Sequence, residues 1–141
     1  ANPGEGIKPL ASIASGGEIS RVMLALKNSL MVGKTSGCEI FDEIDVGISG
    51  EIAAKVAYQL KALSRNHQVI CITHLQQIAS SADHHYSVYK QRIGGRLVTR
   101  IKKLGPEERV KEVASLLSGE AITKSAIAGA RELLKNSRRQ R

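Results

Sequence analysis

Two acidic residues, Asp42 and Glu43, directly follow a short apolar run that contains Ile40 and Phe41. Acids at the carboxyl end of a parallel strand lie where the ligand sites of α/β proteins gather. Two adjacent carboxylates can divide the work of phosphate hydrolysis. Asp42 can hold Mg²⁺ through water, while Glu43 can orient and deprotonate the attacking water. The alternative is an acidic turn that caps the next helix.

A second motif, Ser15-Gly16-Gly17-Glu18, stands directly before an apolar helical stripe. Unpaired N–H groups and the positive end of the helix dipole make a helix start an anion site, and glycines let the backbone approach a phosphate. The same residues also fit a capping box, in which Ser15 and Glu18 satisfy each other without any ligand. Two consecutive glycines are more than a cap requires, which favours a phosphate.

His74 ends the next β-branched run. If the two strands are parallel, their ends share one edge of the sheet, and His74 comes towards Asp42 and Glu43, where it can sense a γ-phosphate. A lone histidine at a strand end is more often hydrogen-bonded locally. His84 and His85 are poor metal ligands, because neighbours on a strand point to opposite faces.

Gly33-Lys34-Thr35 copies the end of a phosphate-binding loop. The full pattern needs a glycine where Asn28 stands, and a strand where the apolar spacing predicts a helix. The sequence therefore contains no lysine loop that cradles the α- and β-phosphates. We expect no ATP hydrolysis by this chain alone.

The apolar spacing predicts the elements that position these motifs. Three- and four-residue steps predict four helices: one from Ile19 to near Gly33 with the stripe Ile19, Val22, Met23, Leu26 and Leu30, one with the stripe Ile52, Val56, Leu60 and Leu63, one from Pro106 to Gly119, and one from Thr123 to Leu134. Strands are predicted at Ile40-Phe41 and, buried, at Gln68 to Thr73, with a hairpin over His85 to Lys103 that turns at Gly94-Gly95.

The order strand, helix, strand implies parallel pairing. The predicted fold class is an α/β lobe with a small, mainly parallel sheet flanked by helices and an antiparallel hairpin. Residues 1–14 are expected to be an irregular lead-in, and residues 136–141 a frayed basic tail. At 141 residues and 42% hydrophobic, the chain suits a single domain.

The composition excludes several classes of protein. No apolar run approaches the length of a membrane span, and no signal peptide is present, so a cytoplasmic protein without a membrane partner is expected. Cys38 and Cys71 match no metal spacing and are predicted to be reduced core residues. The net charge of +8 favours anionic partners. The chain opens on Ala1 without an initiator methionine, which suggests a piece of a longer protein.

The hairpin segment from His84 to Lys103 is basic and contains no acid. Its cations are Lys90, Arg92, Arg96, Arg100, Lys102 and Lys103. Such a surface can contact nucleic-acid phosphates, but Tyr86 and Tyr89 alone make a weak stacking platform, and a solvated ribbon is the simpler alternative. The competing function is therefore a non-enzymatic DNA- or protein-binding module that uses this hairpin.

The motifs in chain order resemble the signature, Walker B, D-loop and switch-histidine series of ABC-type ATPases. The stretches NPGEGIKPLASIASGGEISRVMLALK, FDEIDVGISGEIA and ICITHLQQIASSADHHY resemble the RecN family of SMC-like bacterial DNA-repair ATPases. This resemblance covers nearly the whole chain. The sequence Asp42-Glu43-Ile44-Asp45 disfavours the head of an ABC transporter.

The resemblance implies the C-terminal lobe of an ABC/SMC-type ATPase head that binds ATP and Mg²⁺ and acts in recombinational double-strand-break repair at the bacterial nucleoid. Expected partners are the N-terminal Walker A lobe of the same protein, a second head in a homodimer, and DNA. The resemblance assigns Asp42 to the Mg²⁺ side, Glu43 to the general base and His74 to the γ-phosphate sensor. It further implies that Ser15, Gly16, Gly17 and Glu18 contact the ATP of the opposite head. Asp45 is expected to communicate across the dimer.

Glu39 departs from the family pattern, because it stands inside a strand that is usually apolar throughout. A lone buried carboxylate costs several kcal/mol unless it is paired or neutralised. Either Glu39 reaches the sheet surface, or a basic side chain meets it.

Overall fold

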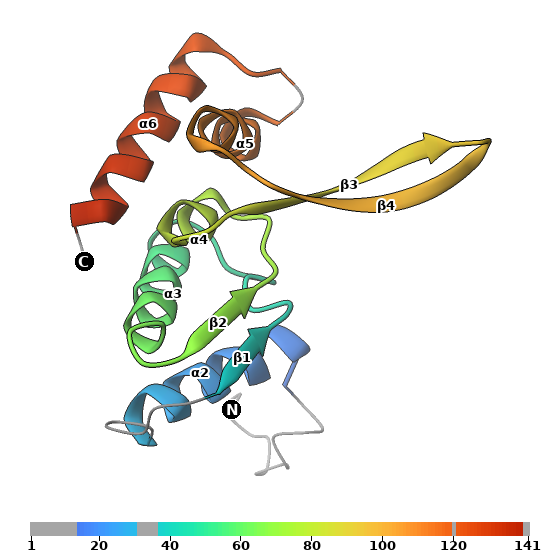
Figure 1. The fold of residues 1–141 in the computed structure, drawn as a ribbon. Helices are drawn as coiled ribbons and strands as arrows, with labels where there is room; N and C mark the ends of the chain where they lie inside the picture. Colours follow the sequence, from blue (N-terminus) through green and yellow to red (C-terminus); the bar gives the residue numbers. More distant parts are fainter. Residues whose placement is uncertain (1–13, 31–36, 120, 140–141) are drawn as a thin grey trace, which may run out of the picture. The chain divides into compact units, whose positions relative to one another are not determined.

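The computed structural model divides the chain into two compact units and describes residues 14–30, 37–119 and 121–139 (Figure 1). The first unit ends at Thr73 and the second begins at His74. The expectations for residues 1–13, for Gly33-Lys34-Thr35 and for residues 140–141 lie outside the described ranges.

In its described residues, the first unit combines two helices with a two-stranded parallel sheet. Its elements are α2 (Gly16–Leu30), β1 (Cys38–Phe41), α3 (Gly50–Leu63) and β2 (Gln68–Cys71). Phe41 stands opposite Cys71 in the register of β1 and β2. The parallel pairing confirms what the order strand, helix, strand predicts. Both strands end at the same edge of the sheet, and Asp42 follows β1 at that edge.

The core of the first unit lies along one face of α3. Its buried apolar residues are Leu24, Phe41, Ile44, Ala53, Val56, Ala57, Leu60 and Leu63. Three of the four residues in the predicted α3 stripe are among them, while Ile52 is exposed. Each fully buried Leu, Ile, Val or Phe contributes roughly 1.5–3 kcal/mol, so this cluster holds the unit together.

The apolar stripe predicted along α2 is not the face that packs inward. The stripe residues are between 38% and 71% exposed: Ile19, Val22, Met23, Leu26 and Leu30. Leu24 is buried instead. Leu24 shares a helix face with Arg21, one turn earlier, and Gly17, two turns earlier, and this face contacts the turn after β1. That contact sets the rotation of α2.

The sheet also leaves one apolar face exposed. Side chains alternate along a strand, so Ile40, Ile70 and Ile72 lie together, with exposed fractions of 66%, 44% and 57%. Cys38 is on this face and is exposed, whereas Cys71, on the other face, is half-buried. The expectations of a fully buried second strand and of a core position for Cys38 are therefore wrong, because the core forms against the opposite face, where Phe41 lies.

Glu39 is met by a basic side chain, which is one of the two solutions expected for it. Its carboxylate lies 2.7 Å from the Lys27 ammonium, and the side chains of Lys27 and Glu39 are 26% and 16% exposed. This ion pair ties α2 to β1. The acidic residue inside the strand therefore belongs to the packing between α2 and the sheet.

Replacing Lys27 by methionine is expected to destabilise the fold by about 1–3 kcal/mol, because the largely buried Glu39 carboxylate loses its partner. The double substitution Lys27→Met/Glu39→Val should recover most of this loss. Urea-induced unfolding measures both. Lys55→Met is the matched control, since it breaks the exposed Lys55–Glu51 pair and should cost about 0.5 kcal/mol or less. Equal losses in Lys27→Met and Lys55→Met would contradict the proposed role of the pair.

The second unit joins three helices to a long hairpin. Its elements are α4 (Gln76–Ser81), β3 (Tyr86–Ile93), β4 (Arg96–Lys103), α5 (Pro106–Ser118) and α6 (Lys124–Arg139). The core between α5 and α6 consists of Val110, Val113, Ala114, Ala126 and Ala130. The sequence predicts the hairpin and α5 at nearly these bounds. It does not predict α4, whose six residues are too short for a helical period.

The last helix is longer than expected. It passes Leu134 and continues to Arg139, so residues 136–139, predicted to be part of a frayed tail, are helical. Ser137 explains the difference, because its hydroxyl donates a 2.8 Å hydrogen bond to the Ser80 carbonyl at the end of α4. This contact fastens the final turns of α6.

Candidate functional site

The first functional motif begins α2 as a capping box. The Ser15 backbone N–H and hydroxyl both donate to the Glu18 carboxylate at 2.8 Å, and the Glu18 N–H donates to the Ser15 hydroxyl at 3.3 Å. These bonds to Ser15, aided by Arg21, lower the pKa of Glu18. A lowered pKa means that the box is intact at neutral pH and is lost as the pH falls through that value. Ser15 and Glu18 thus set the start of the helix.

The two glycines of the motif pack against the residues that follow β1. A Cβ atom on Gly16 would lie 2.7 Å from the Glu43 Oε2 atom. On Gly17 it would lie 2.7 Å from the Glu43 carbonyl oxygen and 3.2 Å from that of Val46. Larger residues would push the start of α2 away from this turn. The structure therefore brings the two motifs together, and the glycines make that approach possible.

Glu43 adopts a backbone conformation that non-glycine residues rarely take. Its φ is 57°, which costs roughly 1–2 kcal/mol for an L-residue. Two hydrogen bonds hold this bend: the Glu43 N–H donates to Asp42 Oδ1 at 2.9 Å, and the Ser20 hydroxyl donates to the Asp42 carbonyl at 3.1 Å. Both carboxylates are exposed. Both carboxylates are therefore accessible at a bend whose backbone is held in place.

Arg21 fixes the same turn from α2. Its Nη1 atom donates to the carbonyls of Ile44 and Val46 at 3.1 Å and 2.9 Å. Together with Ser20 it positions the acidic pair, a role that the sequence motifs do not predict. The available signal was spacing, since Ser20 and Arg21 follow Gly16 and Gly17 by one helical turn and so lie on the same face.

Asp45 faces the interior of the first unit. It is 3% exposed, and its Oδ2 atom accepts a 2.6 Å hydrogen bond from the Thr73 hydroxyl. Thr73 directly precedes His74, which is exposed and begins the second unit. Asp45 is thus tied to the segment that leaves β2 towards His74.

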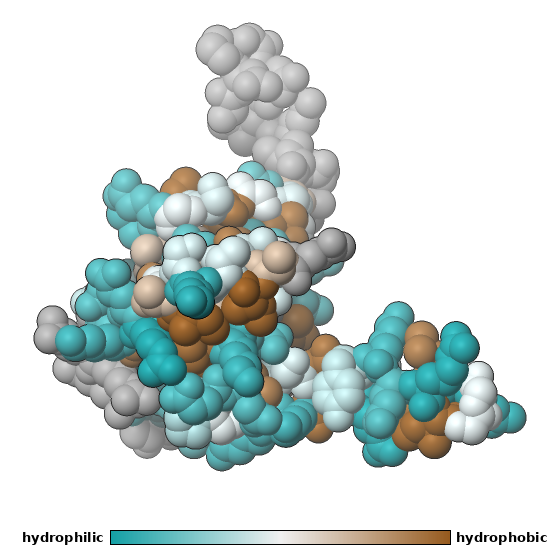
Figure 2. Space-filling model, turned by 90° about the horizontal axis from the view of Figure 1, so that it is seen from above, coloured by the Kyte–Doolittle hydropathy of each residue, from teal (hydrophilic) through white to brown (hydrophobic). Residues whose placement is uncertain are grey.

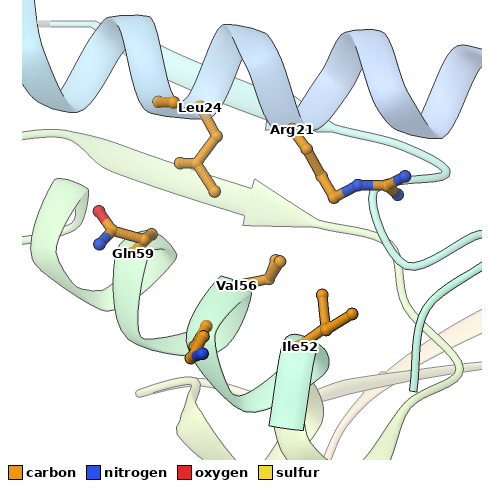
Figure 3. A pocket seen from close by; sticks show the side chains of 7 residues that line it. Arg21, Leu24, Ile52, Val56 and Gln59 are labelled. Atoms are coloured by element: carbon orange, nitrogen blue, oxygen red, sulfur yellow. The ribbon is translucent and has the colours of Figure 1, made fainter. Parts of the chain in front are cut away.

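A shallow groove between α2 and α3 lies beside this site (Figure 3). Its lining is Arg21, Leu24, Ala25, Ile52, Lys55, Val56 and Gln59. Its volume of ≈ 140 Å³ is below the roughly 300–1,000 Å³ of small-molecule sites. The groove is therefore too small to be the nucleotide site.

The acidic pair fits Mg²⁺ as one contributor among several. Across the described residues, no cluster of three or more histidine, cysteine or acidic side chains is placed to hold a metal. Mg²⁺ commonly takes one or two carboxylates and completes its shell with water and phosphate oxygens. The exposed carboxylate of Asp42 suits such a site, whereas Asp45 is engaged with Thr73.

Known proteins match the chain along all or nearly all of its length. A DNA repair protein RecN of Treponema pallidum is 52% identical over 141 residues, which is 100% of this chain. The resemblance to RecN is confirmed. RecN proteins of Deinococcus radiodurans and Bacillus subtilis are 48% and 42% identical over 95% and 96% of the chain. The chain spans about a quarter of the length of these RecN relatives, at 25%, 23% and 24%. No family model matches it.

The fold also has a counterpart among solved structures. A chain from work on ATP-driven dimerization and DNA-stimulated activation of SMC ATPases aligns with a TM-score of 0.53 and 24% identity, over 84% of this chain and 70% of that one. At this identity the likeness concerns the fold, and it confirms the predicted ABC/SMC-type head lobe. Within the ranges that the structure describes, no helix is long and apolar enough to cross a membrane.

Proposed function

We propose that this chain is one lobe of a DNA-repair ATPase whose heads pair when ATP binds and separate after hydrolysis, in recombinational double-strand-break repair. The contact between Gly16 and the Glu43 carboxylate is the observation that carries this proposal. It places a helix start suited to phosphate beside a carboxylate suited to water activation. The names of the RecN relatives support a role in DNA repair.

In the proposed reaction, Glu43 orients a water molecule and accepts its proton as the water attacks the terminal phosphorus of ATP, whose bond to the bridging oxygen breaks to release ADP. The hydrogen bonds to Asp42 and Ser20 hold the bend that presents this carboxylate. When bound beside Asp42, Mg²⁺ supplies charge neutralisation of the phosphates. His74 senses the γ-phosphate, and Asp45 links the turn after β1 to Thr73 and so to His74.

Ser15, Gly16, Gly17 and Glu18 serve the ATP of a second head. The helix start they form is intact as a capping box, and its exposed side can receive an anion. Because this loop contacts Glu43 of its own chain, a nucleotide that presses on the loop also acts on the neighbouring general base. In this proposal, the contact between the loop and Glu43 couples pairing of the heads to hydrolysis.

The N-terminal Walker A lobe of the same protein covers the apolar faces left exposed here. These faces are the α2 stripe and the sheet face with Ile40, Ile70 and Ile72. The RecN relatives are about four times longer than the chain, which leaves ample sequence for such a lobe. It would also supply the lysine loop that the chain lacks.

Mixing this chain with a separate polypeptide that carries the rest of a RecN relative tests the proposal. The chain alone should show no ATP turnover, and the mixture should regain it. Turnover by the chain alone, or a mixture that forms a complex and stays inactive, would refute the split site. The chain with Glu43→Gln is the control that must remain inactive in the mixture.

Cysteine labelling reports whether the two polypeptides of the same mixture assemble. Burial raises the pKa of the Cys71 thiol to about 12, with Asp45 and Asp42 adding to the shift, so its reactive thiolate is scarce. Iodoacetamide should therefore label exposed Cys38 first in the chain alone. The added polypeptide should protect Cys38, because Cys38 shares the sheet face with Ile40. Equal labelling of Cys38 with and without the polypeptide would place the covering lobe elsewhere.

A further inference from the structure

The hairpin of β3 and β4 carries large side chains that its own unit leaves exposed. Every residue of β4 is exposed, and so is every residue of β3 except Ser87. With eight residues per strand, the ribbon is about 26 Å long at roughly 3.3 Å per residue. Figure 2 shows it as the projection on the right, where hydrophilic and hydrophobic side chains lie side by side.

All charged side chains of the ribbon are positive, and most of them form no ion pair within the described residues. Lys102 pairs with Glu108 of α5. The other five cations form no ion pair with any residue in the described part of the chain: Lys90, Arg92, Arg96, Arg100 and Lys103. A hairpin that merely needed solvation would gain from mixed charges, since opposite charges across strands stabilise a ribbon. Five free cations without an acid instead indicate an anionic ligand.

The cations lie on both faces of the ribbon. The register pairs Lys90 with Thr99 and Arg100 with Tyr89, and side chains alternate along each strand. One face therefore carries Lys90, Arg92 and Lys103, and the other carries Arg96, Arg100 and Lys102. A flat acidic protein surface would meet the cations of one face and leave the rest unused. A ligand with anions on two sides meets both.

The base of the ribbon is fixed to the helices of its unit. The Leu104 N–H donates to the His85 carbonyl at 2.9 Å, and the Ser87 hydroxyl donates to Glu112 of α5 at 3.3 Å. At the far end, Gly94 and Gly95 have φ values of 53° and 80°, which suit the tight turn of a two-residue hairpin. The ribbon is thus anchored at one end and free at the other, as a binding arm requires.

We infer that the ribbon enters a groove of duplex DNA and contacts the phosphates of both strands. The major groove of B-DNA admits a two-stranded ribbon and has phosphates along both walls, which matches cations on both faces. These contacts are to the backbone, so binding should be strongly salt-dependent and tolerant of sequence. The inference rests on the proposed function for its ligand, because DNA repair brings the protein to duplex DNA.

The full-length protein that contains this segment is the material for the test. The triple substitution Arg92→Gln/Arg96→Gln/Arg100→Gln should weaken binding to a 30-base-pair duplex by about tenfold or more at 0.1 M salt. It should also reduce the slope of log K against log salt by about 2–3, since each lost phosphate contact removes about 0.9. Duplex should be preferred over single-stranded DNA of equal length. Fluorescence anisotropy measures all three quantities.

Lys111→Gln/Lys124→Gln/Lys135→Gln is the matched control, because it removes three exposed cations from the helices of the same unit. It should leave the salt slope nearly unchanged. Equal weakening by both triple variants, unaltered duplex binding by the ribbon variant, or equal affinity for single strands would each overturn the inference. An acidic protein partner in place of DNA would appear as the second of these outcomes.

The test also separates this inference from the proposed function. The ribbon variant should keep ATP turnover measured without DNA, because its substitutions lie outside the hydrolysis site. Glu43→Gln should lose turnover and keep the duplex affinity and salt slope. Loss of turnover with unchanged DNA binding in the ribbon variant would contradict the inference and leave the hydrolysis site standing.

Discussion

Replacing Glu43 by glutamine in the full-length protein is expected to lower kcat for ATP by about 10²–10⁴-fold, because glutamine keeps the shape of the side chain but cannot accept a proton from water. The KM for ATP should change little, since Glu43 is assigned to the attacking water and not to holding the nucleotide. Steady-state phosphate release with and without DNA measures both parameters. The substituted protein should also remain longer in the paired, ATP-bound state.

Glu51→Gln is the control for this prediction. Glu51 is an exposed carboxylate of the same unit, and it forms a surface ion pair with Lys55. Its substitution should leave kcat within about twofold of the unchanged protein, because exposed pairs of this kind contribute little. DNA-stimulated turnover that survives Glu43→Gln undiminished would remove Glu43 from the reaction and leave the acidic turn as a helix cap.

The fold was most predictable where the signal is local. The glycines at 94 and 95, flanked by alternating side chains, specify the hairpin, and Pro106 and Gly119 bracket α5. Burial was less predictable. An apolar stripe shows that a helix has an apolar face, but it does not identify the element that covers this face. The α2 stripe and the sheet face with Ile40 are two examples, because both are apolar and both are exposed.

The residue types of the candidate site were also readable, whereas their arrangement was not. Residue type, together with a position beside a strand end or a helix start, predicts Asp42, Glu43 and Ser15 as site residues. The contact between the glycines and the turn after β1 joins segments far apart in sequence, and the clamp by Arg21 depends on that contact. Periodicity describes one segment at a time, so such pairings need the fold.

Gly17→Ala is expected to destabilise the first unit by about 1–3 kcal/mol. The new methyl group would lie 2.7 Å from the Glu43 carbonyl oxygen and 3.1 Å from the Arg21 guanidinium. A backbone oxygen cannot turn aside as a flexible side chain can, so α2 must shift away from the turn. This shift would loosen the Arg21 hydrogen bonds to Ile44 and Val46 and misplace Glu43. The free energy of unfolding, measured with denaturant, and the rate of ATP turnover should therefore both fall.

Gly16→Ala should separate these two effects. Its methyl group would meet the end of the Glu43 side chain, which can swing away at little cost, and alanine favours the helix by roughly 0.5–1 kcal/mol over glycine. Stability should stay level or rise slightly, while turnover falls because the carboxylate is displaced. If Gly16→Ala keeps full turnover, the contact does not position Glu43. If Gly17→Ala is as stable as the unchanged protein, α2 does not need its close approach to the turn.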